Sequence, residues 1–182
     1  GSIPICHPDF MEFGGNPTSF KVTQHNGRTS IFDAGTGIRN IGRDLIKNGF
    51  ELPDLFIGFS HFHWDHIQGL PFFDPAYNPD IEINILALTE NKGISDIKDI
   101  FMGQMQLEYF PIPLEKMGAK FNFIKPEHDT IELVGTSIRF IKQNHPGGSY
   151  GYRIEENGKC LVICTDIEHG KTVLPEIVEF CK

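Results

Sequence analysis

The sequence lacks any long apolar run. Nowhere in its 182 residues does a stretch approach the ~20 consecutive apolar residues that cross a bilayer. The N-terminus also lacks the basic segment followed by an apolar segment that marks a secretory signal peptide. We therefore expect a soluble, cytoplasmic chain with no membrane partner.

Positive charge is scarce. Sixteen Lys and Arg residues stand against 24 Asp and Glu, which gives a formal net charge of −8. This balance argues against strong electrostatic binding of nucleic acid or anionic lipid by the protein's own surface. It does not exclude a substrate that carries phosphate, provided that bound cations supply the missing positive charge.

Cysteines are few and widely spaced. Cys6, Cys160, Cys164 and Cys181 form no Cys-x-x-Cys pair and no dense framework of the kind that staples small secreted domains. Reduced thiols in a cytoplasm are the simplest interpretation. Because free cysteine behaves as a small hydrophobe, we expect Cys160 and Cys164, within the run KCLVIC, to be buried.

Repeats and low-complexity segments are also missing, so we expect residues 1–182 to form a single domain. Two Asn-Gly pairs lie between β-rich runs, at Asn26-Gly27 and at Asn157-Gly158. Asn-Gly readily supplies the positive φ angles of a tight turn. The sequence therefore predicts one antiparallel hairpin in each half of the chain.

Helical and extended patterns alternate between these hairpins. Apolar residues at helical spacing predict helices over 37–48, ending at Gly49, and over 95–107. Buried strands are predicted over 54–60 and 83–88, more strands between 120 and 143, and a helical apolar stripe over 173–181. This mixture indicates a layered α/β fold.

The densest chemistry lies in residues 60–66, which read Ser-His-Phe-His-Trp-Asp-His, directly after a predicted buried strand. In an extended segment alternate side chains share a side, so His61, His63 and Asp65 point together, and His66 follows as the chain turns into a short helix. Imidazole and carboxylate suit Zn²⁺, Mn²⁺ or Fe²⁺, and no thiolate lies nearby to form a structural zinc site. We infer a catalytic metal centre.

Two further candidates follow later strands. His145 and Asp166 each lie just past a predicted strand, where loop side chains gather at one edge of a sheet.

SHFHWDH resembles the His-x-His-x-Asp-His signature of the metallo-β-lactamase superfamily. Other segments match that family in order along nearly the whole chain, namely FGGNPTSF, IFDAGTGIR, HWDHIQGLPFFDPAY, NHPGGSYGYRIE and CTD. They are most similar to the phosphodiesterase-type branch, which contains RNase Z and cyclic phosphodiesterases. The resemblance implies a four-layer αββα sandwich.

The resemblance also implies site residues and cofactors. It assigns two divalent ions, zinc first, with manganese or iron as alternatives. The first ion would be held by His61, His63 and His145, and the second by Asp65, His66 and Asp166, with Asp166 bridging both. Asp33 matches a family position that steadies a metal-bound histidine, although a turn-forming or helix-capping aspartate is the alternative.

The chain departs from the family at its ends. A seventh ligand, a histidine well after the bridging aspartate, is absent, and His169 lies only three residues beyond Asp166. GSIP resembles a family segment that an opening strand normally precedes, although Gly-Ser at residues 1–2 could be a cloning remnant. We expect a fragment that lacks the first strand and the C-terminal part, with a weaker second metal site and uncertain activity.

The implied mechanism is hydrolysis of a phosphodiester, such as a cyclic nucleotide, a cyclic phosphate or an RNA-like substrate, by a hydroxide shared between two ions. Asp65 would accept the proton or orient the hydroxide, or only ligate metal. Gly148, Ser149 and Tyr150 could contact phosphate, or could simply connect strands. The aromatic residues Phe62, Trp64, Phe72 and Phe73 could wall the pocket, and more of them are expected to pack in the core than to stack on bases.

Two other functions remain open at this point. The same ligands could serve a thioester, lactone or β-lactam hydrolase, or the chain could be a non-catalytic metal-binding scaffold. The sequence identifies no general acid, and it leaves open whether the protein is a homodimer.

Overall fold

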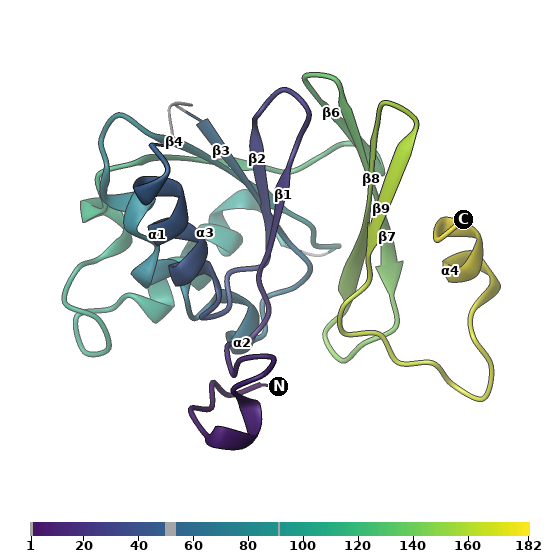
Figure 1. The fold of residues 1–182 in the computed structure, drawn as a ribbon, viewed down its shortest axis with the longest axis horizontal. Helices are drawn as coiled ribbons and strands as arrows, with labels where there is room; N and C mark the ends of the chain where they lie inside the picture. Colours follow the sequence, from purple (N-terminus) through teal and green to yellow (C-terminus); the bar gives the residue numbers. More distant parts are fainter. Residues whose placement is uncertain (1, 50–53, 91) are drawn as a thin grey trace.

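The computed structural model describes residues 2–49, 54–90 and 92–182. Gly1, the first residue of the GSIP segment, lies outside the described residues. Two β-sheets organise the chain, and they stand face to face in Figure 1.

The first sheet has five strands in the order β1-β2-β3-β4-β5. Only β1 and β2 pair antiparallel, and the remaining neighbours are parallel. The strands are β1 (Phe20–Thr23), β2 (Thr29–Phe32), β3 (Asp54–Phe59), β4 (Glu82–Ala87) and β5 (Lys120–Ile124). The second sheet is antiparallel in the order β6-β7-β8-β9, with β6 (Thr130–Leu133), β7 (Thr136–Gln143), β8 (Ser149–Glu156) and β9 (Lys159–Ile163).

Helices cover the outer faces of the sheets. In Figure 1, α1 (Ile38–Lys47) and α3 (Ile94–Gln104) lie against the first sheet, and α4 (Pro175–Phe180) lies outside the second. A single turn of helix, α2 (Trp64–Ile67), follows β3. Short 3₁₀ turns occupy Pro8–Phe10, Leu70–Phe72, Asp74–Tyr77 and Leu114–Lys116. The order helix, sheet, sheet, helix is the four-layer αββα arrangement that the resemblance implied.

The sandwich has two apolar cores. One lies between the helices and the first sheet, where Ile38, Ile57 and Phe101 have no exposed surface. The other lies between the sheets, where Phe32 of β2 meets Tyr152 of β8 with ring centroids 4.8 Å apart. Strand β3 is therefore buried on both faces, which matches the unbroken apolar run predicted for it.

The two predicted hairpins form, but their turns differ. Asn157 (φ 50°) and Gly158 (φ 71°) both adopt the left-handed conformation, as a tight two-residue turn requires. In the first hairpin Thr23 pairs with Thr29, so the loop is five residues long. There the Asn26 side chain accepts a hydrogen bond from the backbone of Arg28 and donates one to the carbonyl of Val134. These contacts favour a wider loop over the tight turn.

Two further expectations need correction. Cys160 is exposed, because it lies on β9, which forms an edge of the second sheet, and Cys164 is only partly buried. The second predicted helix ends at Gln104 rather than near residue 107. Among the described residues, no helix has the length and apolar character needed to cross a bilayer.

Candidate metal centre

Loops at the ends of strands from both sheets bring the predicted site residues together. His61 and His63 follow β3 of the first sheet, whereas His145 and Asp166 follow β7 and β9 of the second. The backbone N–H of Tyr150 donates to the carbonyl of Ser60 at 2.9 Å, which ties the two groups of loops to each other.

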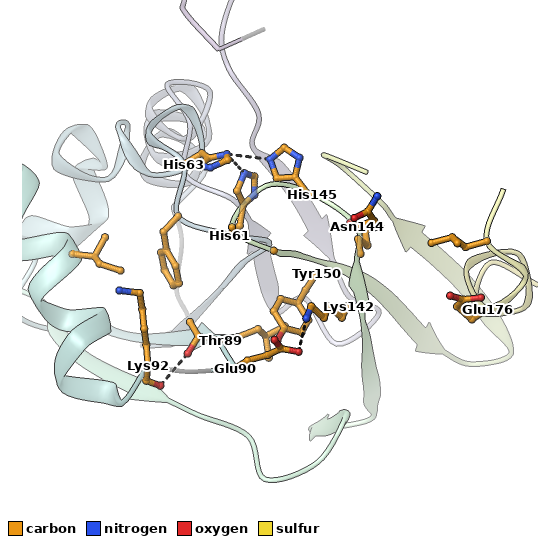
Figure 2. A pocket seen from close by; sticks show the side chains of 17 residues that line it. His61, His63, Thr89, Glu90, Lys92, Lys142, Asn144, His145, Tyr150 and Glu176 are labelled. Carbon is orange, nitrogen blue, oxygen red and sulfur yellow. Dashed lines mark hydrogen bonds and ion pairs between the residues drawn. The ribbon is translucent and has the colours of Figure 1, made fainter. Parts of the chain in front are cut away.

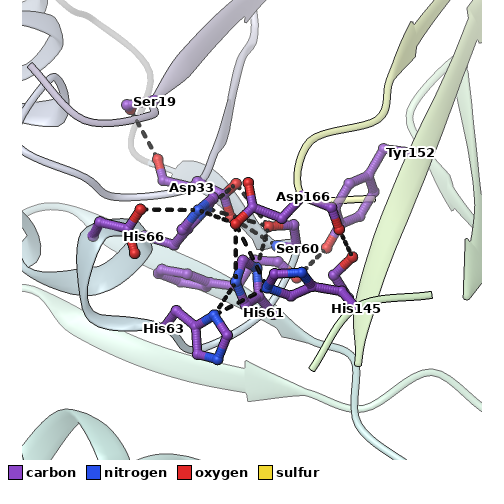
Figure 3. A network of polar contacts seen from close by, with 12 residues as sticks. Ser19, Asp33, Ser60, His61, His63, His66, His145, Tyr152 and Asp166 are labelled. Atoms are coloured by element: carbon purple, nitrogen blue, oxygen red, sulfur yellow. Dashed lines mark hydrogen bonds and ion pairs between the residues drawn. The ribbon is translucent and has the colours of Figure 1, made fainter. Parts of the chain in front are cut away.

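Four side chains converge on one point. His61, His63, His145 and Asp166 each offer a ligand atom, and these atoms all lie within 4.8 Å of one another. The Nδ1 atom of His63 lies 2.9 Å from Nε2 of His61 and 3.1 Å from Nε2 of His145. A carboxylate oxygen of Asp166 lies 3.6 Å from Nε2 of His145 and 3.7 Å from Nε2 of His61. The cluster is visible in Figure 3.

A second group surrounds His66. Its Nε2 atom lies 3.5 Å from a carboxylate oxygen of Asp65 and 3.5 Å from the same Asp166 oxygen that faces the first group. His66 is fully buried, and within the described part of the chain this Nε2 has no hydrogen-bond partner. A buried nitrogen without a hydrogen-bond partner destabilises the folded state unless an ion or another group binds it.

This donor set fits a divalent cation. Imidazole nitrogens and carboxylate oxygens converge from separate loops, and they are ligands that Zn²⁺ and related ions accept. A cation beside His66 would satisfy the nitrogen that protein groups leave unpaired. The residues present therefore fit a divalent metal ion.

The pKa values of two histidines in the cluster shift in opposite directions. Burial, together with the neighbouring His66 and His63, lowers the pKa of His61 to about 3, so its ring is neutral and free to ligate. Burial alone would lower the pKa of His66. Its hydrogen bond to Asp33 and the charges of the surrounding carboxylates outweigh that effect and raise the pKa. A proton or a cation is thus attracted to this ring.

Asp33 contacts His66 on the Nδ1 side of its ring, away from the Nε2 atom that faces the carboxylates. It is buried, and its carboxylate accepts a hydrogen bond from Nδ1 of His66 at 2.8 Å. It has a positive φ of 62°, in the turn after β2, whereas the N-cap of α1 is Gly37 without a side-chain cap. Of the predicted alternatives, Asp33 contacts a histidine and forms a turn, and it does not cap the helix.

Helix α2 is held by two glycines that the sequence analysis did not single out. A Cβ atom on Gly69 would lie 2.1 Å from the carbonyl oxygen of Gly35, and one on Gly35 would lie 2.5 Å from the carbonyl oxygen of Asp65. Backbone hydrogen bonds from Ala34 to His66 (2.7 Å) and from Gly69 to Ala34 (2.8 Å) complete the contact. Close backbone packing therefore fixes Asp65 and His66. Gly35 and Gly69 lie far apart in the sequence, so no local pattern indicates this contact.

Ser149, a candidate for phosphate contact, has no exposed surface. Its side chain is fully buried, and its hydroxyl donates to the backbone carbonyl of Asp166 at 2.7 Å. Asn144 adds two contacts to the same loop, since its carbonyl accepts from the backbone of Glu168 (2.7 Å) and its amide donates to the Glu168 carbonyl (3.1 Å). These contacts hold the loop that carries Asp166.

A cavity of about 710 Å³ opens beside the first group of ligands (Figure 2). His61, His63 and His145 line one end, and Gly148 and Tyr150 also line it. Its far wall carries Lys142 and Glu90, whose charged atoms lie 2.6 Å apart. Burial and the nearby Glu90 raise the pKa of Tyr150. The volume is that of a site for a small molecule.

The aromatic residues near the signature fall into three classes. Phe62 lines the cavity, and Phe73 is buried in the core. Trp64 and Phe72 are 67% and 51% exposed, so the expectation of core packing is wrong for both. Each extends from a one-turn helix at the surface.

Two curated relatives are ribonuclease Z enzymes, and no protein-family model matches the chain. The chain is 28% identical to ribonuclease Z of Ligilactobacillus salivarius over 130 residues, which are 69% of this chain and 38% of the relative. It is 26% identical to ribonuclease Z of Methanosarcina acetivorans over 142 residues, which are 78% and 43% of the two proteins. The chain thus spans about two fifths of the length of these relatives.

Solved structures resemble the whole sandwich. The metallo-β-lactamase fold protein YhfI from Bacillus subtilis aligns with a TM-score of 0.53 at 16% identity, over 81% of this chain and 54% of that one. Human tRNase Z, short form, gives 0.52 at 16% identity, over 84% and 64%. Zn²⁺-bound PqqB from Methylobacterium extorquens gives 0.52 at 16% identity, over 80% and 51%. The chain therefore has the metallo-β-lactamase fold.

Proposed function

We propose that this chain carries the metal centre of a metal-dependent hydrolase that cleaves a small phosphodiester. The observation that carries the proposal is the convergence of His61, His63, His145 and Asp166 within 4.8 Å, at the mouth of a small-molecule cavity. The names of the curated relatives support phosphodiester chemistry, since ribonucleases act on phosphodiesters.

The proposed cofactor is a pair of divalent ions, zinc first, with manganese or iron as alternatives. Nε2 of His61, Nδ1 of His63 and Nε2 of His145 would hold one ion. Asp65 and His66 would hold the other, and Asp166, which faces both groups, would bridge them. When bound, such ions activate water and offset the charge of a phosphate group.

The chain's own residues would supply the remaining functions. The carboxylate of Asp65, 3.5 Å from Nε2 of His66, would accept the proton of the attacking water. Tyr150 and the paired Lys142 and Glu90 would contact the organic part of the substrate in the cavity. Gly148 adopts a positive φ of 81°, which lets its backbone approach a phosphate closely.

Composition supports a proposal on the size of the substrate and on the cellular location of the enzyme. A net charge of −8 favours a small substrate over a nucleic acid that is held by surface charge alone. Four cysteines without a disulfide framework favour a reducing cytoplasm. A homodimer is a further proposal, which sedimentation of the natural protein would test.

The activity is tested on the purified natural protein. We expect it to hydrolyse bis(p-nitrophenyl) phosphate or a cyclic nucleotide with Zn²⁺ or Mn²⁺. Turnover of a thioester alone would contradict the proposed substrate class. No turnover of any substrate, with metal bound, would favour a non-catalytic scaffold.

The metal assignment has its own test. His63→Ala removes the nitrogen that lies nearest to both other histidines of the first group. We expect the variant to lose the first ion, so that elemental analysis finds at least one metal equivalent fewer than in the wild type. His128→Ala, in the loop between β5 and β6, is the matched control, and unchanged metal content in His63→Ala would refute the assignment.

A further inference from the structure

Both groups of metal ligands are connected to a single buried carboxylate. The Asp33 carboxylate accepts from Nδ1 of His66 at 2.8 Å, and among the described residues its other hydrogen bonds are both with Ser60. The backbone N–H of Ser60 donates to Oδ1 of Asp33 at 2.7 Å, and the Ser60 hydroxyl lies 2.8 Å from Oδ2. That hydroxyl also lies 3.0 Å from Nδ1 of His61. Figure 3 shows the network.

The chemistry of the groups fixes the direction of each hydrogen bond. A carboxylate only accepts, so the single proton of the Ser60 hydroxyl points to Asp33. The hydroxyl oxygen can then only accept. It lies 3.0 Å from Nδ1 of His61 and 3.4 Å from Nδ1 of His66, whose proton goes to the nearer Asp33 at 2.8 Å, so the oxygen accepts from His61, which places a proton on Nδ1 of that ring. Because His66 also donates from Nδ1, the Nε2 atoms of both rings face the ligand clusters, and that of the neutral His61 ring is unprotonated.

Water cannot easily replace Ser60 in this role. The exposed fractions of Asp33, Ser60 and His61 are 1%, 3% and 4%. Among the described residues, the Ser60 hydroxyl is the one hydrogen-bond partner of His61 Nδ1. Loss of this hydroxyl would leave a buried donor unpaired and the ring free to change its tautomer.

We propose that Ser60 is a positioning residue through which one carboxylate, that of Asp33, orients a histidine of each metal site. Asp33 acts on His66 directly and on His61 through the Ser60 hydroxyl. The inference rests on the proposed metal centre. It predicts an asymmetry, since Ser60 affects chiefly the first site whereas Asp33 affects both.

The variants follow from this asymmetry. Ser60→Ala removes the hydroxyl but keeps the backbone N–H that donates to Asp33. Ser60→Thr retains a hydroxyl and should restore the wild-type behaviour. Ser30→Ala is the matched control, because Ser30 is equally buried in the first sheet and its hydroxyl contacts Gln24, away from the histidines.

The first measurement is the tautomer of His61, read from imidazole ¹⁵N chemical shifts of the natural protein without metal. We expect the Nδ1–H form in the wild type, in Ser60→Thr and in Ser30→Ala, and a mixture of both forms in Ser60→Ala. Nδ1 of His66 should keep its proton, which Asp33 accepts, in all four proteins. An unchanged His61 tautomer in Ser60→Ala would overturn the proposal.

The second measurement is zinc affinity by chelator competition. In Ser60→Ala we expect the affinity of the first site to fall by about 10–100-fold, as when other residues behind metal-bound histidines are removed. A fall of less than twofold would also overturn the proposal. If the wild type bound no zinc, the proposed function would fail, and the tautomer measurement would still decide the role of Ser60.

Discussion

Single residues outside the ligand set determine where the ligands lie, and Tyr152 is the clearest case. Its side chain is buried between the sheets, and its hydroxyl donates to the carbonyl of Phe59, the last residue of β3, at 2.7 Å. Burial raises its pKa well above the usual value, so the hydroxyl remains a donor at ordinary pH. The bond holds the strand that leads into His61 against the second sheet.

Tyr152→Phe should therefore reduce stability although it removes only one atom. The carbonyl of Phe59 would lose this partner in a buried place, which costs about 1–3 kcal/mol in the free energy of unfolding. Urea denaturation measures the change. Tyr109→Phe is the control, because Tyr109 is 75% exposed and should give no measurable effect. Equal stability of Tyr152→Phe and the wild type would show that the hydrogen bond contributes nothing.

At the scale of elements, local sequence patterns predicted the helices and turns that interactions within a few residues determine. The helix over 38–47 and the Asn157-Gly158 turn follow from spacing and from backbone preference within a few residues. The five-residue loop at Asn26 could not be predicted, because its side chain bonds to Val134, more than 100 residues away. The exposure of Cys160 depends on β9 being an edge strand, which is equally a property of the assembled sheet.

The close backbone packing that holds α2 against the turn after β2 can be tested at Gly69. An alanine Cβ there would lie 2.1 Å from the carbonyl oxygen of Gly35, so α2 would have to shift with Asp65 and His66. We expect Gly69→Ala to lose about 1–3 kcal/mol of stability and to weaken metal binding at the second site. Denaturation and chelator competition measure the two effects.

Gly103→Ala provides the matched control. Gly103 lies in α3, and an added Cβ meets nothing within 4 Å. Alanine in a helix should raise stability by about 0.5–1 kcal/mol and leave metal binding unchanged. The steric explanation for Gly69 would be wrong if both alanine variants behaved alike.

At the scale of the whole molecule, the candidate site exists only because two sheets face each other. The sequence identified His61, His63, Asp65 and His66 by spacing alone, since they lie within six positions after one strand. His145 and Asp166 were identified with help from a family resemblance, because the pairing of distant strands brings them to the cluster. The role of Ser60 and the Lys142–Glu90 ion pair in the cavity depend on contacts between distant residues, which no sequence pattern predicts.

This geometry predicts that metal stabilises the whole fold rather than one loop. An ion held by His61 and His63 from one sheet and by His145 from the other would join the sheets, and unfolding would have to release it. At a free zinc concentration 100 times the dissociation constant, linkage gives about 2.7 kcal/mol, or a rise in Tm of about 5–10 °C for a chain of this size. Thermal unfolding after chelation and after zinc addition measures the rise. His145→Ala should abolish most of it, and a full zinc-dependent rise in that variant would mean that the ion does not connect the two sheets.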